Sequence, residues 1–479
     1  MLFFALALVV AREAHRRAGP LAAAFALILV ATSATAIAQF RPGRIDHHNA
    51  QILCAVAGLV LLARSSYDNR AGWIGGTLLG LGLAIGYEAM ALVVPALGIA
   101  ALAAVWQPRQ GGGVARAATA ATATLIAAFA LTNPPTHWLD VRCDALSLNL
   151  PVLAVYATAG LWAAMSGGPK RAVRFAILGA AMVAGSAATA ALEPACLAGP
   201  FGQVGAALGP VWLDHVMETK SILWLAASHP ATALAAVAFV LAGAAAQVAL
   251  WRHRPDTSTA LAASFVVLAA VLGCWQLKLM PYAAWLAAVP LAVWAAGLGG
   301  TASLSAPVMR AAALVLLSQA TLDAGFNALA SPFRRTAEPG TTAVESADPR
   351  RPCFQSHSVR RLAALPPGLV AADIDLGPYI VALSPHRVVA APYHRLEKGI
   401  LANHAILRGT PDEALPKLRA LGVSYVALCA DRATGERPLR GGENSLRARL
   451  LGNERPEFLH ELELPQGTPI RVWKMEPAR

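Results

Sequence analysis

Acidic and imidazole side chains follow one another just before an apolar run of the sequence. The segment reads Arg41-Pro-Gly-Arg-Ile-Asp46-His47-His48-Asn49-Ala-Gln51. A carboxylate beside two imidazoles can bind a divalent cation or orient a phosphate, which Arg41 and Arg44 would also attract. The alternative is a polar helix cap with Asp46 near the helix N-terminus. The segment contains more polar residues than a cap needs, which favours a binding site.

Polar residues also stand out in other segments. A long loop over 193–221 contains Trp212-Leu-Asp214-His215-Val216-Met217-Glu218-Thr219-Lys220, and it exceeds the length that joining two helices requires. A short turn over 275–282 carries Lys278, which can either snorkel at a membrane interface or face a cavity and pair with a lipid-linked phosphate. Glu88 lies inside an apolar stretch, where lipid exposure is too costly, so we predict that it faces the same cavity.

The composition indicates that lipid surrounds most of the chain. Of 479 residues, 56% are hydrophobic and 14% charged, and the mean hydropathy is +0.52. The apolar runs recur at near-regular spacing, and most approach the length that crosses a bilayer. We predict about twelve spans, near residues 1–10, 20–39, 49–63, 73–87, 89–106, 117–132, 146–164, 175–192, 229–250, 258–275, 281–298 and 310–327. The fourth and fifth run together, and we place their division near Tyr87-Glu88.

Lysine and arginine are distributed unequally between alternate loops. One set of loops holds thirteen of these residues and the other holds five. The richer set is expected in the cytoplasm, which places Asp46, Glu218 and Lys278 outside. The net charge of +12 follows from this topology, so no nucleic-acid partner is expected. The first span is too short to cross unaided; either it is a stub, or the natural N-terminus lies upstream.

The character of the sequence changes near residue 330. A linker rich in Pro, Arg, Ser and Thr occupies 331–352. Beyond it, β-rich runs at 369–374, 379–383, 388–391, 423–429 and 470–473 alternate with helical patterns at 397–407, 412–421 and 445–451. This alternation predicts an α/β domain over 353–479. The expected fold class is therefore mainly α, a polytopic transmembrane helical bundle over 1–330 with a C-terminal extracytoplasmic α/β domain.

Four of the six cysteines fall in segments that we place in an oxidising compartment outside the membrane. Bridges from Cys143 to Cys196 and from Cys353 to Cys429 are possible, although the sequence does not fix their connectivity. Cys54 and Cys274 fall within or at the ends of apolar spans. The sequence contains no P-loop, dinucleotide glycine fingerprint, zinc-type Cys/His spacing or nucleophile elbow.

In this order, the polar motifs resemble those of the oligosaccharyltransferase catalytic subunits, a family within the GT-C class of polytopic glycosyltransferases that use polyprenyl-linked sugar donors. Asp46-His47-His48 is similar to an external motif that helps bind a divalent metal at a helix mouth. His215-Val216-Met217-Glu218 resembles an external-loop motif that closes with Glu, and Lys278 is placed like a basic residue that contacts the donor pyrophosphate.

The C-terminal domain carries a further part of the resemblance. Asp373-Ile-Asp375-Leu-Gly377-Pro-Tyr379, followed by His386-Arg387 and Tyr393-His394-Arg395, retains the Asp-x-Gly-x-Tyr frame of the family's C-terminal motif. The family's tryptophan pair, which serves recognition of the Asn acceptor sequon, is absent, so the acceptor stays unassigned. The family also carries an acidic metal ligand after a first span, and twelve spans starting outside fit a chain that begins beyond that loop.

The resemblance implies metal-assisted transfer of a sugar or oligosaccharide from a polyprenyl-(di)phosphate donor to an acceptor at the extracytoplasmic face. The expected setting is a bacterial-type cytoplasmic (inner) membrane, and the expected cofactor is Mg or Mn. The implied roles are catalysis by Asp46 and Glu218, metal binding by Asp46, His48 and Glu218, donor phosphate binding by Lys278, Arg44 and His47, and acceptor contact by Asp375, Gly377, Tyr379, His394 and Arg395. The alternatives are a transporter or flippase of a lipid-linked saccharide and a scaffolding membrane protein.

Overall fold

The computed structural model describes residues 1–41, 47–168, 170–216, 219–299, 305–330, 351–430, 442–454, 456–464 and 468–476. These residues form two compact units. The first contains the described residues between Met1 and Gln203 and between Met217 and Arg334. The second contains Val204–Val216 and the described residues between Arg335 and Arg479.

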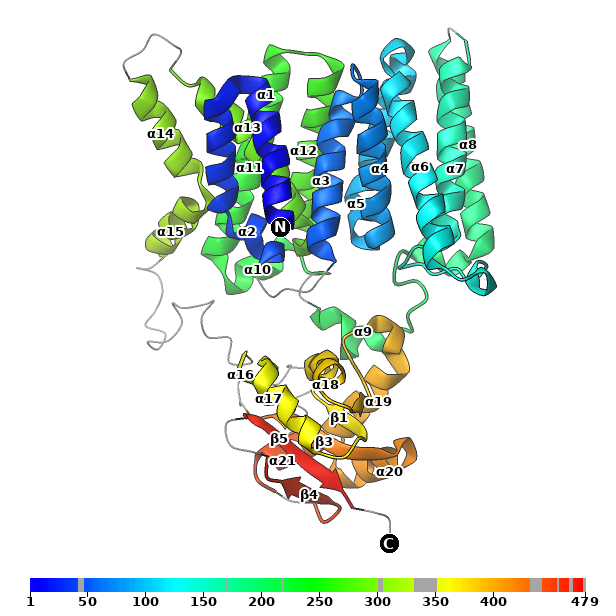
Figure 1. The fold of residues 1–479 in the computed structure, drawn as a ribbon, viewed down its shortest axis with the longest axis vertical. Coiled ribbons are helices and arrows are strands. Elements are labelled where there is room, and N and C mark those ends of the chain that lie inside the picture. The colour runs from blue at the N-terminus through cyan, green and yellow to red at the C-terminus, as the bar shows by residue number, and fades with distance from the viewer. Residues whose placement is uncertain are drawn as a thin grey trace. The chain divides into compact units, whose positions relative to one another are not determined.

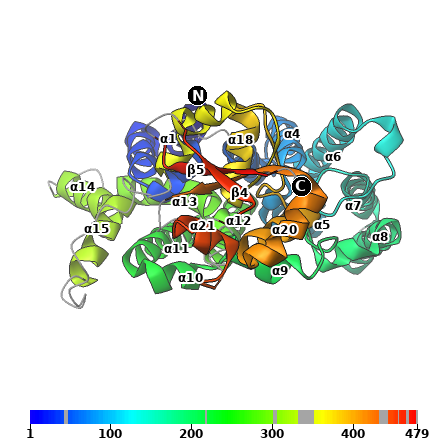
Figure 2. The same ribbon diagram turned by 90° about the horizontal axis from the view of Figure 1, so that it is seen from below.

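The first unit is a bundle of apolar helices (Figure 1). Its elements are α1 (Leu2–Ala31), α2 (Ala34–Ile37), α3 (His48–Arg64), α4 (Asn69–Ile85), α5 (Met90–Trp106), α6 (Gly112–Thr132), α7 (Asn149–Ser166), α8 (Arg171–Leu192), α10 (Ile222–Ser228), α11 (Pro230–His253), α12 (Thr257–Trp275), α13 (Met280–Gly297), α14 (Ala306–Leu317) and α15 (Gln319–Ala330). In both views α14 and α15 lie at one end of the bundle and α7 and α8 at the other (Figures 1 and 2).

The lengths and composition of these helices are those of a multi-pass membrane protein. Among the described residues, six helices are long and apolar enough to cross a membrane, or up to eight if each of two bent pairs is one span. Each segment that we predicted as a span contains helix. The number of about twelve spans stays a prediction, because several of these helices are bent or are shorter than a bilayer requires.

The first helix extends beyond the span predicted at 1–10. It continues to Ala18 and Gly19, whose backbone angles are not helical, and a second helical segment follows from there. The apolar run ends earlier because the next turn is charged, but the charges are paired: Arg16 Nη2 and Arg17 Nε each lie 2.6 Å from Glu13 Oε1. This pairing lets Glu13 remain almost fully buried inside the bundle.

Glycines bring α4 and α6 into close contact. A Cβ on Gly72 would lie 2.2 Å from the carbonyl oxygen of Gly113, and one on Gly76 would lie 2.1 Å from that of Ala117. The two glycines are four residues apart, so they face the same neighbour. Backbones in membrane helix pairs approach this closely where small residues line the interface. The stripe therefore fixes the separation of α4 and α6.

Alanine at Gly76 is expected to lower the thermal unfolding midpoint of the purified protein in detergent, because one added methyl group forces the helices apart at a cost of about 1–3 kcal/mol. The matched control is Gly98→Ala in α5, where an added Cβ meets nothing within 4 Å. A midpoint equally unchanged in both variants would show that this contact does not limit stability.

Short 3-10 turns interrupt the bundle where polar residues occur. The turn η2 (Tyr87–Ala89) separates α4 from α5, and η8 (Leu277–Leu279) separates α12 from α13. The predicted division near Tyr87-Glu88 is therefore confirmed. Each break places one polar side chain, Glu88 or Lys278, at a helix end rather than within a helix.

The second unit is built on a sheet that, in the described residues, has five strands in the order β2-β1-β3-β5-β4. β1 (Leu369–Ala372) is parallel to β2 (Arg387–Val388) and β3 (Val423–Cys429), whereas β5 (Ile470–Met475) is antiparallel to β3 and to β4 (Leu459–Leu462). The surrounding helices are α9 (Leu208–Val211), α16 (Arg351–Phe354), α17 (Ser356–Arg360), α18 (Gly377–Leu383), α19 (Glu397–Arg408), α20 (Pro411–Leu421) and α21 (Leu446–Leu451).

Alternate residues of the central strands enter two separate apolar cores. Tyr425 and Ala427 pack with Val359 of α17 and Ile380 of α18. Val426 and Leu428 pack with residues of α19, α20 and α21 on the opposite face. Because successive strand residues point to opposite faces, these two cores show that helices cover both faces of the sheet.

One prediction for this unit is wrong, and one strand was not predicted. The run 379–383, predicted as a strand, belongs to the helix α18, and β4 lies where no element was predicted. A short apolar run does not distinguish a strand from a buried helix, and Pro378 in the first turn fits a helix start because its missing N–H costs nothing there. In β4, the pattern Leu-His-Glu-Leu lacks the β-branched and aromatic residues that mark a strand.

Both proposed disulfides form. One joins Cys143 to Cys196, and the other joins Cys353 to Cys429. Cys54 and Cys274 are free thiols in α3 and α12. Each disulfide joins two cysteines of the same compact unit, so neither links the two units to each other.

Candidate functional site

His47, His48 and Glu88 meet at the start of α3. Their candidate ligand atoms all lie within 4.8 Å of one another, with His48 buried, Glu88 partly buried and His47 exposed. His47 Nε2 lies 3.6 Å from Glu88 Oε2, and the two imidazole rings are 4.4 Å apart between centroids. Two imidazoles and a carboxylate within this distance are a donor set that suits a divalent transition metal.

The local fold explains this meeting. His47 caps α3 and His48 is its first residue, whereas Glu88 lies on η2, just after the end of α4. Since α3 and α4 follow one another and pack together, the end of α4 returns to the start of α3. Residues forty positions apart in the sequence thereby reach one place at the end of the bundle.

Gln51, one turn into α3, joins the elements around this cluster. Its side chain is fully buried. Its Nε2 donates to the carbonyl oxygen of Gly86 and lies 3.5 Å from Glu88 Oε2, and its Oε1 accepts a hydrogen bond of 3.1 Å from the hydroxyl of Tyr282. The amide therefore connects α3, the η2 turn and α13. A Cβ on Gly86 would lie 2.6 Å from Glu88 Oε2, so a larger residue there would make the carboxylate shift.

Lys278 lies on the turn that packs against the turn of Glu88. The η8 and η2 turns are neighbours, and Lys278 is partly buried. The N–H of Leu277 donates to the carbonyl oxygen of Lys220 at 2.8 Å, which fixes the end of the long loop beside η8. The loop of Lys220, the turn of Lys278 and the His47–His48–Glu88 cluster thus lie at the same end of the bundle.

Three predicted site residues lie outside the described residues: Asp46, Arg44 and Glu218. Asp46 directly precedes His47 in the sequence, and Glu218 stands two positions before Lys220. His215, from the motif that closes with Glu218, is exposed, and its Nε2 lies 3.1 Å from the carbonyl oxygen of Pro210.

The predicted C-terminal motif follows two parallel strands. Asp375 lies on the 3-10 turn η11 (Ile374–Leu376) after β1, and Gly377 and Tyr379 lie on α18. His394 and Arg395 lie on η12 (His394–Leu396), which follows β2. Because β1 and β2 are parallel neighbours, both segments begin at the carboxyl ends of the strands, on the side of the sheet where open α/β sheets bind ligands.

The residues of this motif differ in their surroundings. Tyr379 is 42% exposed, and its ring lies 5.2 Å from that of Phe354. Gly377 is buried, and a Cβ there would lie 2.4 Å from the carbonyl oxygen of Ala390. Asp373, which opens the motif, is structural: it accepts hydrogen bonds of 3.0 Å from Arg447 Nε and from the N–H of Cys429.

Part of this arrangement was not predicted. We expected Glu88 to face a cavity but did not count it among the metal ligands, and the role implied for His47 was donor phosphate binding, although it belongs to a motif compared with a metal-binding one. Gln51 gave a signal, because an amide one turn into an apolar helix needs a partner. Tyr282 gave none, because its hydroxyl partner is 231 positions away in the sequence.

Solved structures resemble this chain, although no family model matches its sequence. No curated protein matches the sequence either. The archaeal oligosaccharyltransferase AglB from Archaeoglobus fulgidus, in complex with an inhibitory peptide and a dolichol-phosphate, superposes with a TM-score of 0.62 at 12% identity, over 99% of this chain and 62% of that one. The oligosaccharyltransferase of the same organism tethered to an acceptor peptide with an NVT sequon gives 0.61 at 13% identity, over 99% and 61%.

The apo form of that enzyme gives a TM-score of 0.60 at 14% identity, over 96% of this chain and 60% of that one. At such low identity these likenesses show the fold alone. The chain thus has the fold of the archaeal oligosaccharyltransferase, over about 62% of that protein's length, and the resemblance inferred from the sequence motifs is confirmed at the level of the fold.

Proposed function

We propose that this chain is a membrane glycosyltransferase that moves a sugar or oligosaccharide from a polyprenyl-(di)phosphate donor to an acceptor at the extracytoplasmic face. The observation that carries the proposal is the meeting of His47, His48 and Glu88 beside the turn of Lys278, within an oligosaccharyltransferase fold. The archaeal enzyme has been solved with dolichol-phosphate and with an acceptor peptide. We extend a lipid-linked donor and an acceptor of this general kind to the present chain.

The donor set fits a divalent cation. His47, His48 and Glu88 supply two nitrogens and a carboxylate within 4.8 Å, and Asp46 and Glu218 are the further ligands that we propose from the sequence. Imidazole nitrogens favour transition metals over Mg²⁺, so Mn²⁺ fits this set better than Mg²⁺ does. When bound, such a cation would neutralise the negative charge that grows on the leaving phosphate.

The protein's own groups would position the donor. Lys278 would attract the phosphate as a point charge, assisted by Arg44 and His47. Transfer breaks the bond from the sugar's anomeric carbon to the phosphate oxygen and forms one to the acceptor's nucleophilic atom, whose proton passes to Asp46 or Glu218. The long loop before Lys220 would exclude water, which would otherwise hydrolyse the donor.

The second unit would serve the acceptor. Asp375, Gly377, Tyr379, His394 and Arg395 follow the carboxyl ends of β1 and β2, where a peptide or lipid acceptor could be held. The unequal Lys and Arg content of alternate loops supports a multi-pass arrangement in a bacterial-type inner membrane with this unit outside.

Transfer of labelled sugar tests the proposal. Membranes of cells that express the chain would be incubated with a polyprenyl-diphosphate sugar labelled in the sugar, and label that leaves the lipid would be measured. We expect release of label to the acceptor fraction, its loss after chelation, and its recovery with Mn²⁺. Labelled donor that crosses the bilayer with its sugar–phosphate bond intact would instead indicate a flippase, and would overturn the proposal.

A further inference from the structure

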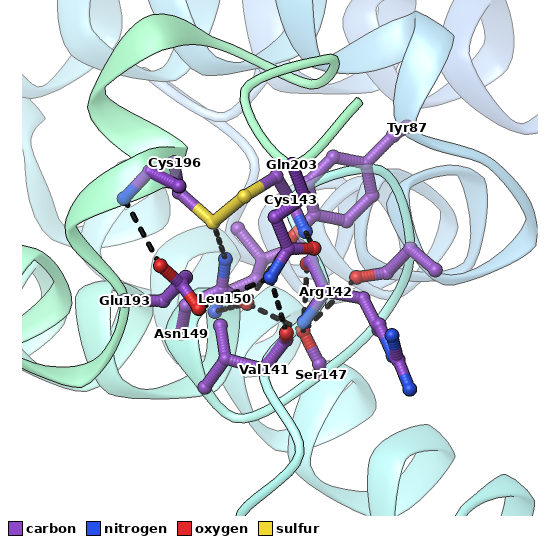
Figure 3. The surroundings of a disulfide bond; sticks show 12 residues. Tyr87, Val141, Arg142, Cys143, Ser147, Asn149, Leu150, Glu193, Cys196 and Gln203 are labelled. Atoms are coloured by element: carbon purple, nitrogen blue, oxygen red, sulfur yellow. Dashed lines mark hydrogen bonds between the residues drawn. A yellow bond between two sulfur atoms is a disulfide. The ribbon is translucent and has the colours of Figure 1, made fainter. Parts of the chain in front are cut away.

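Tyr87, the neighbour of Glu88 on η2, contacts a different set of residues from the His47–His48–Glu88 cluster. Its hydroxyl donates to Asn149 Oδ1 at 3.3 Å, at the start of α7 (Figure 3). Tyr87 and Asn149 are each 9% exposed. The two neighbours on η2 thus make separate contacts: Glu88 with the histidines and Gln51, and Tyr87 with Asn149.

Asn149 is held firmly in its orientation. Its Oδ1 also accepts a hydrogen bond of 2.9 Å from the N–H of Leu150 and lies 2.9 Å from the hydroxyl oxygen of Ser147, whose single proton is shared with the carbonyl oxygen of Arg142. Its Nδ2 lies 4.0 Å from the Sγ of Cys196, which forms the disulfide with Cys143 (Figure 3). The oxygen that receives Tyr87 is therefore positioned by neighbouring residues of its own segment, and the amide nitrogen of the same side chain faces the sulfur of Cys196.

The disulfide in turn lies in a hydrogen-bonded loop pair. The N–H of Cys143 donates to Gln203 Oε1 at 3.2 Å, and Gln203 Nε2 donates to the carbonyl oxygen of Val141 at 3.0 Å and to Glu193 Oε2 at 3.1 Å. The bridge joins the loop before α7 to the 3-10 turn η5 (Pro194–Ala198) after α8, 53 residues apart in the sequence. Without it, the hydrogen bonds of Gln203 and the helical hairpin of α7 and α8 would still connect these two loops, but no covalent bond would join them directly.

We propose that Asn149, held in place by the Cys143–Cys196 disulfide, is a positioning residue that fixes η2 and thereby aims Glu88 at the cation site. The turn η2 continues directly into α5, and because a 3-10 turn has poorer internal hydrogen bonds than an α-helix, side-chain contacts add to the helices in positioning it. Gln51 holds η2 from α3, and Asn149 holds it from α7. This inference rests on the proposed cation site. It adds a residue that does not bind the cation itself but holds the turn that carries Glu88.

The second disulfide offers a matched control. The Cys353–Cys429 disulfide lies in the core of the second unit. The backbone N–H of Cys429 donates a hydrogen bond to the carboxylate of Asp373. Removing it takes away one bridge of the same chemistry without touching the residues around η2. A general effect of losing a disulfide is thereby separated from an effect on Glu88.

Binding of Mn²⁺ alone to the purified full chain in detergent tests the inference. The free ion would be titrated by its electron paramagnetic resonance signal. We expect Asn149→Ala and the pair Cys143→Ser with Cys196→Ser to weaken binding about 10-fold, as outer contacts of metal ligands typically do. Cys353→Ser with Cys429→Ser should bind like the unchanged protein.

Tyr87→Phe is the mildest variant, because it removes a single hydroxyl group. It tests the same contact if Asn149→Ala or the loss of the Cys143–Cys196 disulfide prevents folding. We expect a loss of about 3-fold for Tyr87→Phe, and no additional loss when it is added to Asn149→Ala, because both remove one interaction. Losses that multiply in the double variant, or normal Mn²⁺ binding in every variant around η2, would overturn the positioning role while leaving the cation site intact. Absence of Mn²⁺ binding by the unchanged protein would overturn the cation site itself.

Discussion

Replacing Glu88 by glutamine is expected to lower kcat/KM for sugar transfer about 100-fold, because the amide keeps the side chain's shape but removes its charge from the cluster. Glu88 Oε2 lies 3.6 Å from His47 Nε2 and 3.5 Å from Gln51 Nε2, so its place in the structure is set on two sides. Glutamine can keep the contact with Gln51 if its amide group is flipped. The loss of kcat/KM then measures the effect of removing the negative charge. The measurement is the initial rate of label transfer at varied donor concentration.

The chain offers a matched acid for comparison. Asp140 pairs with His137 at 2.7 Å on the loop before α7, with both side chains exposed, and it lies outside the proposed cluster. Asp140→Asn should leave transfer unchanged, because it breaks an exposed pair of a kind that contributes little. If the two substitutions reduce transfer equally, the rate reflects general damage to the loops, and the role of Glu88 is lost.

Lys278→Met is expected to reduce kcat/KM about 10-fold to 100-fold, corresponding to about 1.5–3 kcal/mol for a charged hydrogen bond to phosphate. Methionine keeps the length and apolar stem of the side chain and removes only the ammonium group. Because this contact exists before the sugar bond breaks, most of the loss should appear in KM. Lys278→Arg should recover part of it, since the guanidinium also binds phosphate.

The control for Lys278 is a lysine from the other set of loops. Lys170 precedes α8, on a loop that we place in the cytoplasm, and Lys170→Met should not change KM. An unchanged KM in Lys278→Met would mean that this side chain only snorkels at the interface, which was the alternative interpretation of its position. The η8 turn would then contribute to the bundle but not to donor binding.

The helices were predictable because their signal is local. Runs such as 229–250 and 258–275 are apolar along their length, and they became α11 and α12 with ends close to those expected. The end of the first helix was not predictable, because the segment that continues it is charged. Its burial depends on Glu13 meeting Arg16 and Arg17, and on Arg17 meeting Gln247, 230 positions away.

The candidate site was predictable in part. His47 and His48 could be identified because they are adjacent, and Glu88 because a carboxylate inside an apolar stretch must find a polar place. Both features were expected near the donor phosphate, but a direct contact between them could not be predicted, since it depends on the packing of α3 against α4. The hydrogen bond between Tyr87 and Asn149 joins residues 62 positions apart, so no local sequence pattern predicts it.

Pulsed electron paramagnetic resonance of Mn²⁺ bound to the full chain tests the central claim most directly. If His47 and His48 bind the cation with Glu88, the echo modulation should show coupling to imidazole nitrogen, weaker in His47→Ala and in His48→Ala and absent when both are replaced. Bound Mn²⁺ whose spectrum shows no nitrogen coupling, or coupling that survives both replacements, would contradict a cation site at the start of α3.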